Sequence, residues 1–498
     1  MEINQEMGGA QSFSMLMCQR IVNSDISEDF TLPDYCPEIR RVLYVKEELP
    51  VPARFVSGNK IDVSGVVDYT LVYVNNDGEV CSAPLSAEYS FALPIDNAAE
   101  FDLGGGVSVI AHSFADNSSV RVSAPRRLQI RTRLRTGVCA WGKMLGSDNF
   151  EGLENECSLE RLVGEGECAD IVCESSDVIT LADEYMLQGE NYNIALVDSA
   201  VFVESSRIEN DGIAVSGEAL IKMLVICDEK NETVTRKLPF EAEIDLSGID
   251  MSFDPSARVN GHVTDVSVQI DDLKAQIELS FVLEACVAQN RPLCYTKDIY
   301  STDQECECQM RPYSLPVLLD NKTFSFSQSE KLSCSELNFP EGAEIIHIYG
   351  SGSVDGIALE EGKNMLTGSC KYNVICLVGG EYTHVEARVP FKYELDCEQD
   401  IDAFDGVIRL SDCKARSDGE VISFESDISA SLALFGSKMT EMPTSVCFGE
   451  MREESKDRWI VYYVTPDDDL WSIAKRYGVS QERIKGDVGS DRYVMIEK

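Results

Sequence analysis

The chain has 498 residues, of which 44% are hydrophobic, so it has enough apolar material for several cores and is not a disordered chain. Its net charge of −43 argues against nucleic acid or an anionic bilayer as a partner, because both are bound through clustered cations. No apolar run reaches about 18 residues, and no basic leader precedes an apolar core at the N-terminus. We therefore expect no transmembrane segment, no export signal and a cytoplasmic location.

The cysteines and histidines do not follow a metal-binding pattern. The 18 cysteines are scattered without a CxxC pair, and the four histidines (His112, His262, His347 and His384) lie far apart in the sequence. We therefore expect reduced and mostly buried thiols, no metal site and no cofactor.

The first predicted elements are strands. After Gly65, apolar residues occupy every second position as far as Tyr73, and a turn, "NNDGE", separates them from a second alternating run that ends near Ile95. A further alternating run, "RLQIRTRLRTGV", begins at Arg127. A period of two is typical of strands with one face on a core.

The same pattern then recurs twice. Gly217 lies 152 residues after Gly65, and Gly368 lies 151 residues after Gly217. Each of these glycines is followed by an alternating strand, a turn and a second strand, which contains Phe240 in one copy and Phe391 in the other. The sequence therefore predicts a mainly β protein with three tandem antiparallel β-sandwich or barrel-like repeats, and little helix before the C-terminus.

The predicted domains follow these copies along the chain. They are a first β domain (10–147), an acidic linker (148–180), a second β domain (181–310), a third β domain (311–448), a short linker (449–458) and a small C-terminal domain (459–498).

A basic stripe interrupts the acidic composition of the first copy. Arg131, Arg133 and Arg135 alternate along one strand and share a face opposite Ile130 and Leu134. One interpretation is a docking site for an acidic partner or for a neighbouring copy. The other is a solvated strand face whose charges pair across the sheet.

Catalytic signatures are absent from the sequence, which contains no HExxH, no P-loop and no GxSxG. The glycine-rich stretch "GSGSVDG" (350–356) lacks GxGxxG spacing, and we expect a β-turn there rather than a phosphate cradle. The chain is therefore predicted not to be an enzyme.

The C-terminal segment changes from strand to helix periodicity. After the predicted strand "WIVYYVT", Asp468 or Asp469 can cap a helix that Gly478 ends. A second helix over 481–485 and a last strand, "RYVMIEK", follow. The apolar face of the first helix consists of Leu470, Ile473, Ala474 and Tyr477.

This segment resembles a LysM module, a small α+β (βααβ) domain with a PGDT loop, an LWxIA helix start and a YGVS turn. The resemblance implies that ligands meet two loops, one before the first helix and one before the last strand. The candidate ligand- or partner-binding residues are Pro466, Asp467, Asp468, Asp469, Leu470, Trp471, Gly486 and Asp487.

Both loops depart from the glycan-binding pattern. The Gly and Thr of PGDT are Asp467 and Asp469 here, and the second loop, "GDVGSD" (486–491), has no Asn. Adjacent carboxylates carry hydration that a neutral sugar does not replace, whereas a basic protein surface or a helix N-terminus suits them. Three roles are open for residues 467–469: helix capping with solvation, contact with a protein, and glycan binding. Trp471 is expected to pack partly buried rather than stack on a sugar.

The repeats resemble the SPOCS domain, an all-β family of spore-forming anaerobic Firmicutes, through "FTLPDYCPEIRRVLYV" (30–45) and "KDIYST" (297–302). SPOCS repeats before a C-terminal LysM are the arrangement of SipL-like spore-coat morphogenetic proteins. The resemblance implies a non-enzymatic scaffold at the forespore surface in the mother cell, bound to a morphogenetic ATPase of the coat basement layer. The alternative is a cell-wall protein whose LysM binds peptidoglycan or N-acetylglucosamine.

Overall fold

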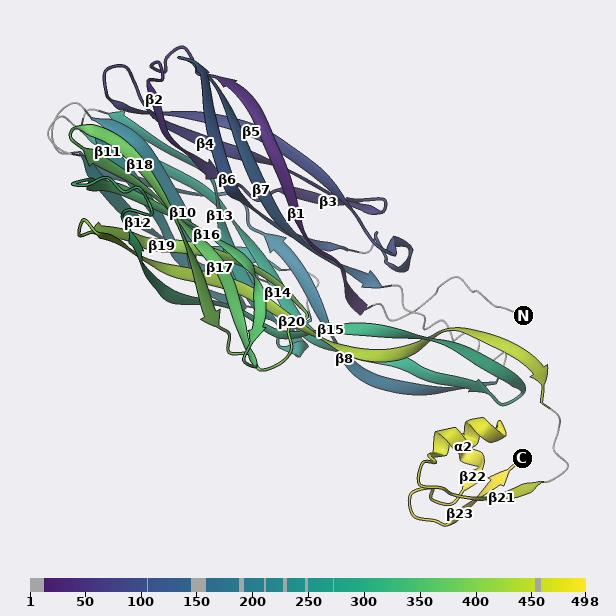
Figure 1. Ribbon diagram of the computed structural model, residues 1–498. Coiled ribbons are helices and arrows are strands. Elements are labelled where there is room, and N and C mark those ends of the chain that lie inside the picture. Colours follow the sequence, from purple (N-terminus) through teal and green to yellow (C-terminus); the bar gives the residue numbers. More distant parts are fainter. Residues whose placement is uncertain are drawn as a thin grey trace.

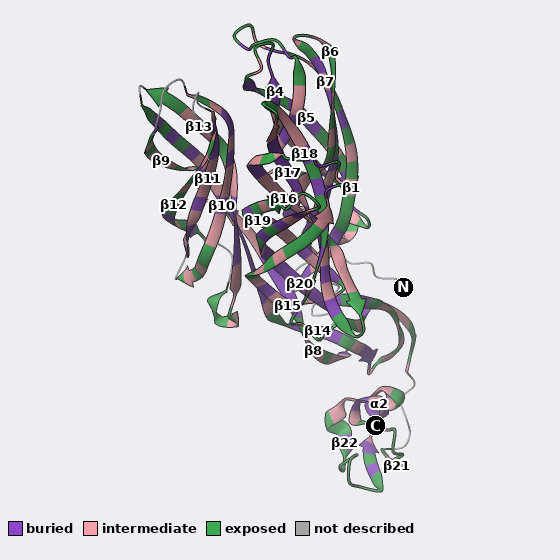
Figure 2. Cartoon of the chain, turned by 60° about the vertical axis from the view of Figure 1, so that its left-hand side comes forward, coloured by how far each residue is buried: buried purple, intermediate pink, exposed green. Residues whose placement is uncertain are grey.

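The structure is a computed structural model that describes residues 13–104, 106–144, 158–187, 192–209, 212–226, 231–246, 250–271, 273–452 and 458–498. Antiparallel strands make up nearly all of it (Figure 1). Buried and exposed residues alternate along most strands (Figure 2), as expected for sheets with one face on a core. Within the described ranges, no helix is long and apolar enough to cross a membrane.

The first β-unit packs two sheets, β1-β7-β6 and β2-β4-β3 with β5 also on β4, around a shared core. Its elements are β1 (Phe13–Thr31), β2 (Arg41–Glu48), β3 (Ala53–Ser57), β4 (Lys60–Val74), β5 (Val80–Pro94), η1 (Ala98–Glu100), β6 (Ser108–Ala124) and β7 (Arg127–Met144).

The second β-unit has the sheets β10-β11-β12 and β13-β14-β8, with β9 also on β14. Its elements are β8 (Leu159–Ser175), β9 (Ile179–Met186), β10 (Asn193–Glu209), β11 (Gly212–Ile226), β12 (Glu232–Asp245), η2 (Met251–Phe253), β13 (Ser256–Asp271) and β14 (Lys274–Ser301).

The third β-unit has the sheets β15-β20-β19 and β16-β17-β18. Its elements are β15 (Gln304–Ser333), β16 (Glu344–Glu360), β17 (Lys363–Val378), β18 (Glu381–Glu394), β19 (Ala403–Ser417) and β20 (Val421–Met451).

The small C-terminal unit has one sheet, β21-β23-β22, and a helix. Its elements are β21 (Trp459–Tyr463), α2 (Leu470–Tyr477), η3 (Gln481–Arg483), β22 (Ile484–Lys485) and β23 (Tyr493–Glu497). The predicted fold class, mainly β with a small α+β unit at the C-terminus, is confirmed.

The repeat glycines have the same structural role in all three β-units. Each lies directly opposite an aromatic residue of the next strand, in the pairs Gly65–Tyr89, Gly217–Phe240 and Gly368–Phe391. A Cβ on Gly368 would lie 2.5 Å from the Phe391 ring and 2.2 Å from the backbone oxygen of Ser353. Glycine is therefore required where an aromatic ring covers the strand.

The three β-units surround a common axis, because equivalent positions meet in two buried clusters. One cluster holds Val72, Leu224 and Ile375, each seven residues after its repeat glycine. The other holds Cys139, Cys286 and Ala433, from β7, β14 and β20. Equivalent positions of three units come together at an axis of approximate three-fold symmetry.

The second and third units extend into an arm. The ribbons β8–β14 and β15–β20 run beyond the body toward the C-terminal unit (Figure 1). They enclose a small core of Leu159, Ile299 and Val446.

The predicted linker over 148–180 is wrong in its described part. Residues Leu159–Ser175 form β8, and β9 begins at Ile179. Glu165 and Glu167, two acids of this segment, are exposed positions of an alternating strand whose partner, β14, is more than 100 residues away. Residues 148–157 lie outside the described ranges.

Two further boundaries differ in the same way. The boundary at 310 falls within β15, and 449–451 of the second linker belong to β20. The predicted division there followed the sequence repeat, whereas the strands continue through it to build the arm.

The stretch 350–356 is not a β-turn, because it lies within β16. A Cβ on Gly350 would lie 2.6 Å from the sulfur of Cys413, and one on Gly352 would lie 2.5 Å from Leu410 Cδ1. These glycines let β16 approach β19 and close one edge of the third unit.

Candidate functional site

Helix α2 positions the first candidate loop of the C-terminal unit. Asp469 caps it, because its Oδ1 accepts the Ser472 N–H at 2.6 Å while Ser472 Oγ accepts the Asp469 N–H at 3.1 Å. Gly478 ends the helix with φ of 59°. Ile473 and Ala474 are fully buried against the sheet.

The predicted second helix over 481–485 is shorter than expected. It is a 3-10 turn, Gln481–Arg483, and Ser480 provides no side-chain cap. Ile484 instead pairs with Ile496 and is buried, so sheet pairing ends the helical conformation after one turn.

Two of the three consecutive carboxylates of the first loop stabilise the loop itself. Asp468 Oδ2 accepts hydrogen bonds from Thr465 Oγ1 at 2.7 Å, from Thr465 N at 2.8 Å and from Tyr462 OH at 2.8 Å. The Thr465 hydrogen bonds lower the pKa of Asp468, and the Ser472 N–H lowers that of Asp469. Asp467 is exposed, and the described contacts give it no partner. One carboxylate of the three is therefore free for a ligand.

The other residues of the two loops are also placed. Pro466 is exposed, Leu470 is half-buried, and Gly486 is exposed with φ of 119°. Asp487 accepts from Gly489 N and from Ser490 Oγ, each at 2.9 Å, and these bonds lower its pKa. The second loop is thus closed by its own hydrogen bonds.

Trp471 is buried, with 7% of its surface exposed, against the arm. Its indole Nε1 donates to Asp298 Oδ2 at 2.8 Å, and Lys475 Nζ lies 2.6 Å from Asp298 Oδ1. Tyr300 donates to the Val479 carbonyl at 2.8 Å, and its ring centroid lies 4.8 Å from that of Trp471. Trp471 therefore attaches the C-terminal unit to the segment 297–302 and is not exposed to stack on a sugar.

The outer face of the C-terminal sheet is the most apolar exposed surface of this unit. Tyr463 and Tyr493 are paired across β21 and β23 and are 64% and 52% exposed, with ring centroids 6.1 Å apart. The same face also carries Trp459, Val461 and Met495, with Lys485 opposite Met495 and Glu497 opposite Trp459.

The arginine stripe of β7 does not act as one surface. Arg133 pairs with Asp25 of the neighbouring strand at 3.2 Å, and Arg131 is exposed. Arg135 reaches the third unit, where it lies 2.8 Å from Asp355 Oδ1. The stripe thus combines a pair across the sheet with a contact to a neighbouring copy, and Arg131 is left facing solvent.

A buried charge cluster joins the three β-units. The cluster is built from equivalent positions of the three units, Lys46, Asp198 and Tyr349. Each lies opposite, on the neighbouring strand, the residue five positions after the repeat glycine of its unit. Lys46 Nζ lies 3.0 Å from Asp198 Oδ1 and 5.3 Å from the Tyr349 ring centroid. His347 Nε2 lies 2.7 Å from Asp198 Oδ2. Burial opposes the charge, but Lys46 and His347 hold the pKa of Asp198 at about 2.

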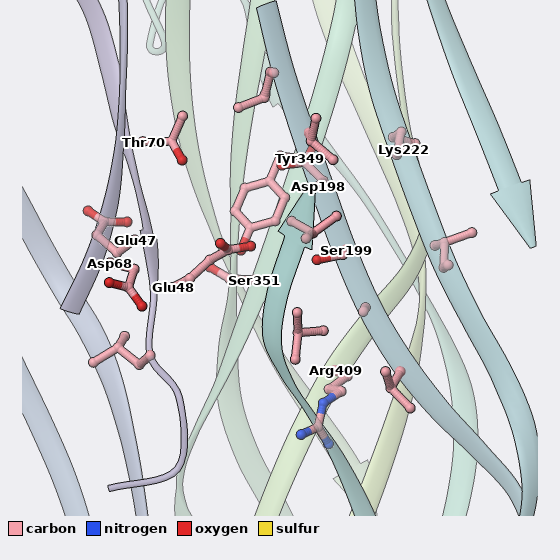
Figure 3. A pocket seen from close by; sticks show the side chains of 18 of the residues that line it. Glu47, Glu48, Asp68, Thr70, Asp198, Ser199, Lys222, Tyr349, Ser351 and Arg409 are labelled. Atoms are coloured by element: carbon pink, nitrogen blue, oxygen red, sulfur yellow. The ribbon is translucent and has the colours of Figure 1, made fainter. Parts of the chain in front are cut away.

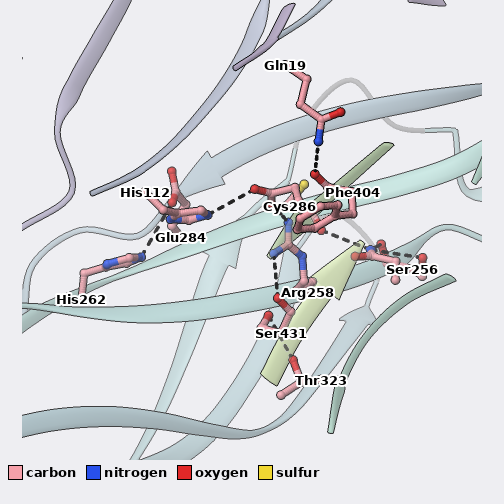
Figure 4. A network of polar contacts seen from close by, with 12 residues as sticks. Gln19, His112, Ser256, Arg258, His262, Glu284, Cys286, Thr323, Phe404 and Ser431 are labelled. Carbon is pink, nitrogen blue, oxygen red and sulfur yellow. Dashed lines mark hydrogen bonds and ion pairs between the residues drawn. The ribbon is translucent and has the colours of Figure 1, made fainter. Parts of the chain in front are cut away.

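A second polar network lies further along the junction (Figure 4). Arg258 of the second unit, 1% exposed, forms an ion pair with Asp405 of the third unit. His112, His262 and Glu284 lie beside it, with their ligand-type atoms all within 4.8 Å of one another. Such a set could bind a metal by ligand type.

The charges around this set disfavour a cation. Arg54 forms an ion pair with Glu284, and burial together with Arg409, His112 and Arg54 holds the pKa of His262 well below its usual value. A divalent ion would add its charge beside the half-buried guanidinium groups of Arg54 and Arg409. We therefore assign no metal to these residues.

Sequence reasoning missed the junction residues. The available signal was a charged residue within an otherwise apolar strand, such as Lys46 in "VLYVKEE" or Asp198 in "IALVDSAV". Among strands with one solvated face, the sequence alone does not distinguish an outward charge from one that faces another unit.

Comparison with known families identifies the C-terminal unit. The family model of the LysM domain matches residues 462–486, which include α2 and the first candidate loop. No curated protein and no solved structure matches the chain. The chain therefore carries a C-terminal LysM domain, which supports a carbohydrate-binding or adaptor role.

Proposed function

We propose that this chain is a non-enzymatic adaptor in spore-coat assembly that binds a protein partner through its LysM domain. The observation that carries the proposal is the outer face of the LysM sheet. Exposed aromatic residues at adjacent positions, here Tyr463 and Tyr493, are typical of protein-binding surfaces.

The loops support a protein partner rather than a glycan. Asp467 presents a free carboxylate where a neutral sugar would have to approach, and the indole of Trp471 is covered by the arm. A basic group on a protein would instead pair with Asp467.

The resemblance of the repeats to SPOCS domains extends the proposal to the partner and the place. The partner would be the morphogenetic ATPase of the coat basement layer, and the location would be the mother-cell side of the forespore. The three β-units would then be the scaffold that carries the LysM domain at the end of the arm.

The second candidate is a peptidoglycan-binding cell-wall protein, which the LysM family match favours. In that case the chain would be retained by purified peptidoglycan, and chitin oligomers would compete it away.

The test is affinity capture from sporulating cells with the full-length chain as bait. We expect the double substitution Tyr463→Ser/Tyr493→Ser to abolish capture of the ATPase, because it removes the centre of the apolar face. Tyr35→Ser, at a tyrosine that is 79% exposed in the first unit, is the control and should leave capture unchanged. Undiminished capture by the double variant would refute the assigned face, and competed retention on peptidoglycan would favour the second candidate.

A further inference from the structure

A cavity of about 780 Å³ lies between the three β-units. All three contribute to its wall, and its labelled side chains include Asp68 from the first unit, Lys222 from the second and Arg409 from the third (Figure 3). A volume of this size suits a small organic ligand.

One part of the wall carries a cation without a counter-charge. Arg409 is half-buried, and the described contacts give it neither an ion pair nor a hydrogen bond. Burial lowers its pKa to about 10. The equivalent residues of the other units are Phe114 and His262, so this cation is particular to the third unit. Lys222 differs from Arg409, because it lies opposite Asp198 of β10 and has a polar contact of 3.4 Å to the Ile348 carbonyl.

The wall formed by the first unit is acidic (Figure 3). Glu48 pairs with Lys46 at 2.7 Å, and Glu47 lies 3.8 Å from Lys371. Asp68 is half-buried, and no described contact neutralises it. Charges of both signs therefore face the same cavity without partners.

A partly buried charge without a partner is costly unless a ligand or water compensates it. A plain anion would pair with Arg409 but would be repelled by the acidic wall. A plain cation would pair with Asp68 but would be repelled by Arg409. A molecule with one charge of each sign satisfies both sides.

We propose that this cavity binds a small zwitterionic molecule, with its carboxylate against Arg409 and its ammonium group against Asp68. The site is separate from the LysM face, so this proposal does not depend on the proposed adaptor function.

Isothermal titration calorimetry of the full-length protein tests this, with trialanine as the zwitterionic probe. We expect trialanine to bind, and trialanine amide and N-acetyl-trialanine, which each lack one charge, to bind more weakly. Arg409→Leu should weaken trialanine binding by about tenfold or more, because it removes a charge-assisted hydrogen bond. Arg416→Leu, at an exposed position of the same strand β19, should leave binding unchanged.

A second variant distinguishes loss of a ligand contact from a folding defect. Asp68→Asn should weaken trialanine binding but leave N-acetyl-trialanine binding unchanged, because that probe has no ammonium group. Circular dichroism confirms that each variant is folded. Absence of trialanine binding to the unsubstituted protein, or equal binding by folded Arg409→Leu, overturns the proposal.

Discussion

At the scale of single residues, the junction explains why the repeats differ. Lys46, Asp198 and Tyr349 occupy equivalent positions near the axis, so three identical copies would place three like side chains together. Three lysines or three aspartates would repel, whereas the observed set pairs a cation with an anion and an aromatic ring. Fusion into one chain allows each copy to carry a different member, and the copies are therefore not interchangeable.

The repeat glycines give the first prediction. Gly368→Ala should lower the free energy of unfolding by about 1–3 kcal/mol, because the added methyl overlaps the Phe391 ring and a backbone oxygen. Gly356→Ala is the matched control in the same unit, since a Cβ there meets nothing within 4 Å. Urea unfolding followed by circular dichroism measures both. Equal midpoints for the two variants would contradict the packing argument.

At the scale of elements, the arm determines which surfaces of the LysM domain are accessible. Helix α2 faces the β14–β15 hairpin through Trp471, which leaves the opposite, outer face of the sheet exposed. Asp298 is central to this contact because it accepts from both Trp471 and Lys475.

We predict that Asp298→Ala weakens the attachment of the LysM domain to the arm. Loss of hydrogen bonds to a partly exposed carboxylate should cost about 1–2 kcal/mol. Hydrogen exchange should then be faster in peptides that cover 297–306 and 470–478. Glu307→Ala, at an exposed acid of the same hairpin, is the control and should leave exchange unchanged. Unchanged exchange in Asp298→Ala would show that the contact does not hold the domain.

The elements also show what the sequence could and could not predict. The alternation after Gly65, Gly217 and Gly368, and the helix between Asp469 and Gly478, follow from local periodicity and capping, so both were predictable. The arm was not, because β8 joins a sheet only through a partner far along the chain. The burial of the Trp471 side chain was predictable, but its hydrogen-bond partner Asp298 was not.

At the scale of the whole molecule, the histidines connect the β-units. His347 bonds Asp198 of the second unit, and the His384 ring stacks on Tyr44 of the first with centroids 4.9 Å apart. Because the half-buried His384 imidazole lies at such a boundary, its titration makes the assembly of the three units sensitive to acid.

The direction of that sensitivity follows from the pKa shifts. Burial, with Lys371 nearby, lowers the pKa of His384 to about 4, below its ordinary value near 6.5. The unfolded chain then takes up this proton first, so stability falls as the pH drops from about 6.5 to about 4. Asp198, with its pKa at about 2, contributes stability above its ordinary value near 4 that is lost as the pH falls further toward 2.

We therefore predict that the thermal midpoint falls between pH 7 and pH 4, and that His384→Phe makes this fall smaller. Phenylalanine retains an aromatic ring to stack on Tyr44 but has no proton to bind. His384 also hydrogen-bonds Asn373 at 2.9 Å, so Asn373→Ala is the control, since it removes the same hydrogen bond and keeps the imidazole. Circular dichroism melts across this range should show a reduced pH dependence in His384→Phe and an unreduced one in Asn373→Ala. If both variants retain the full dependence, then His384 does not link the junction of the three units to pH.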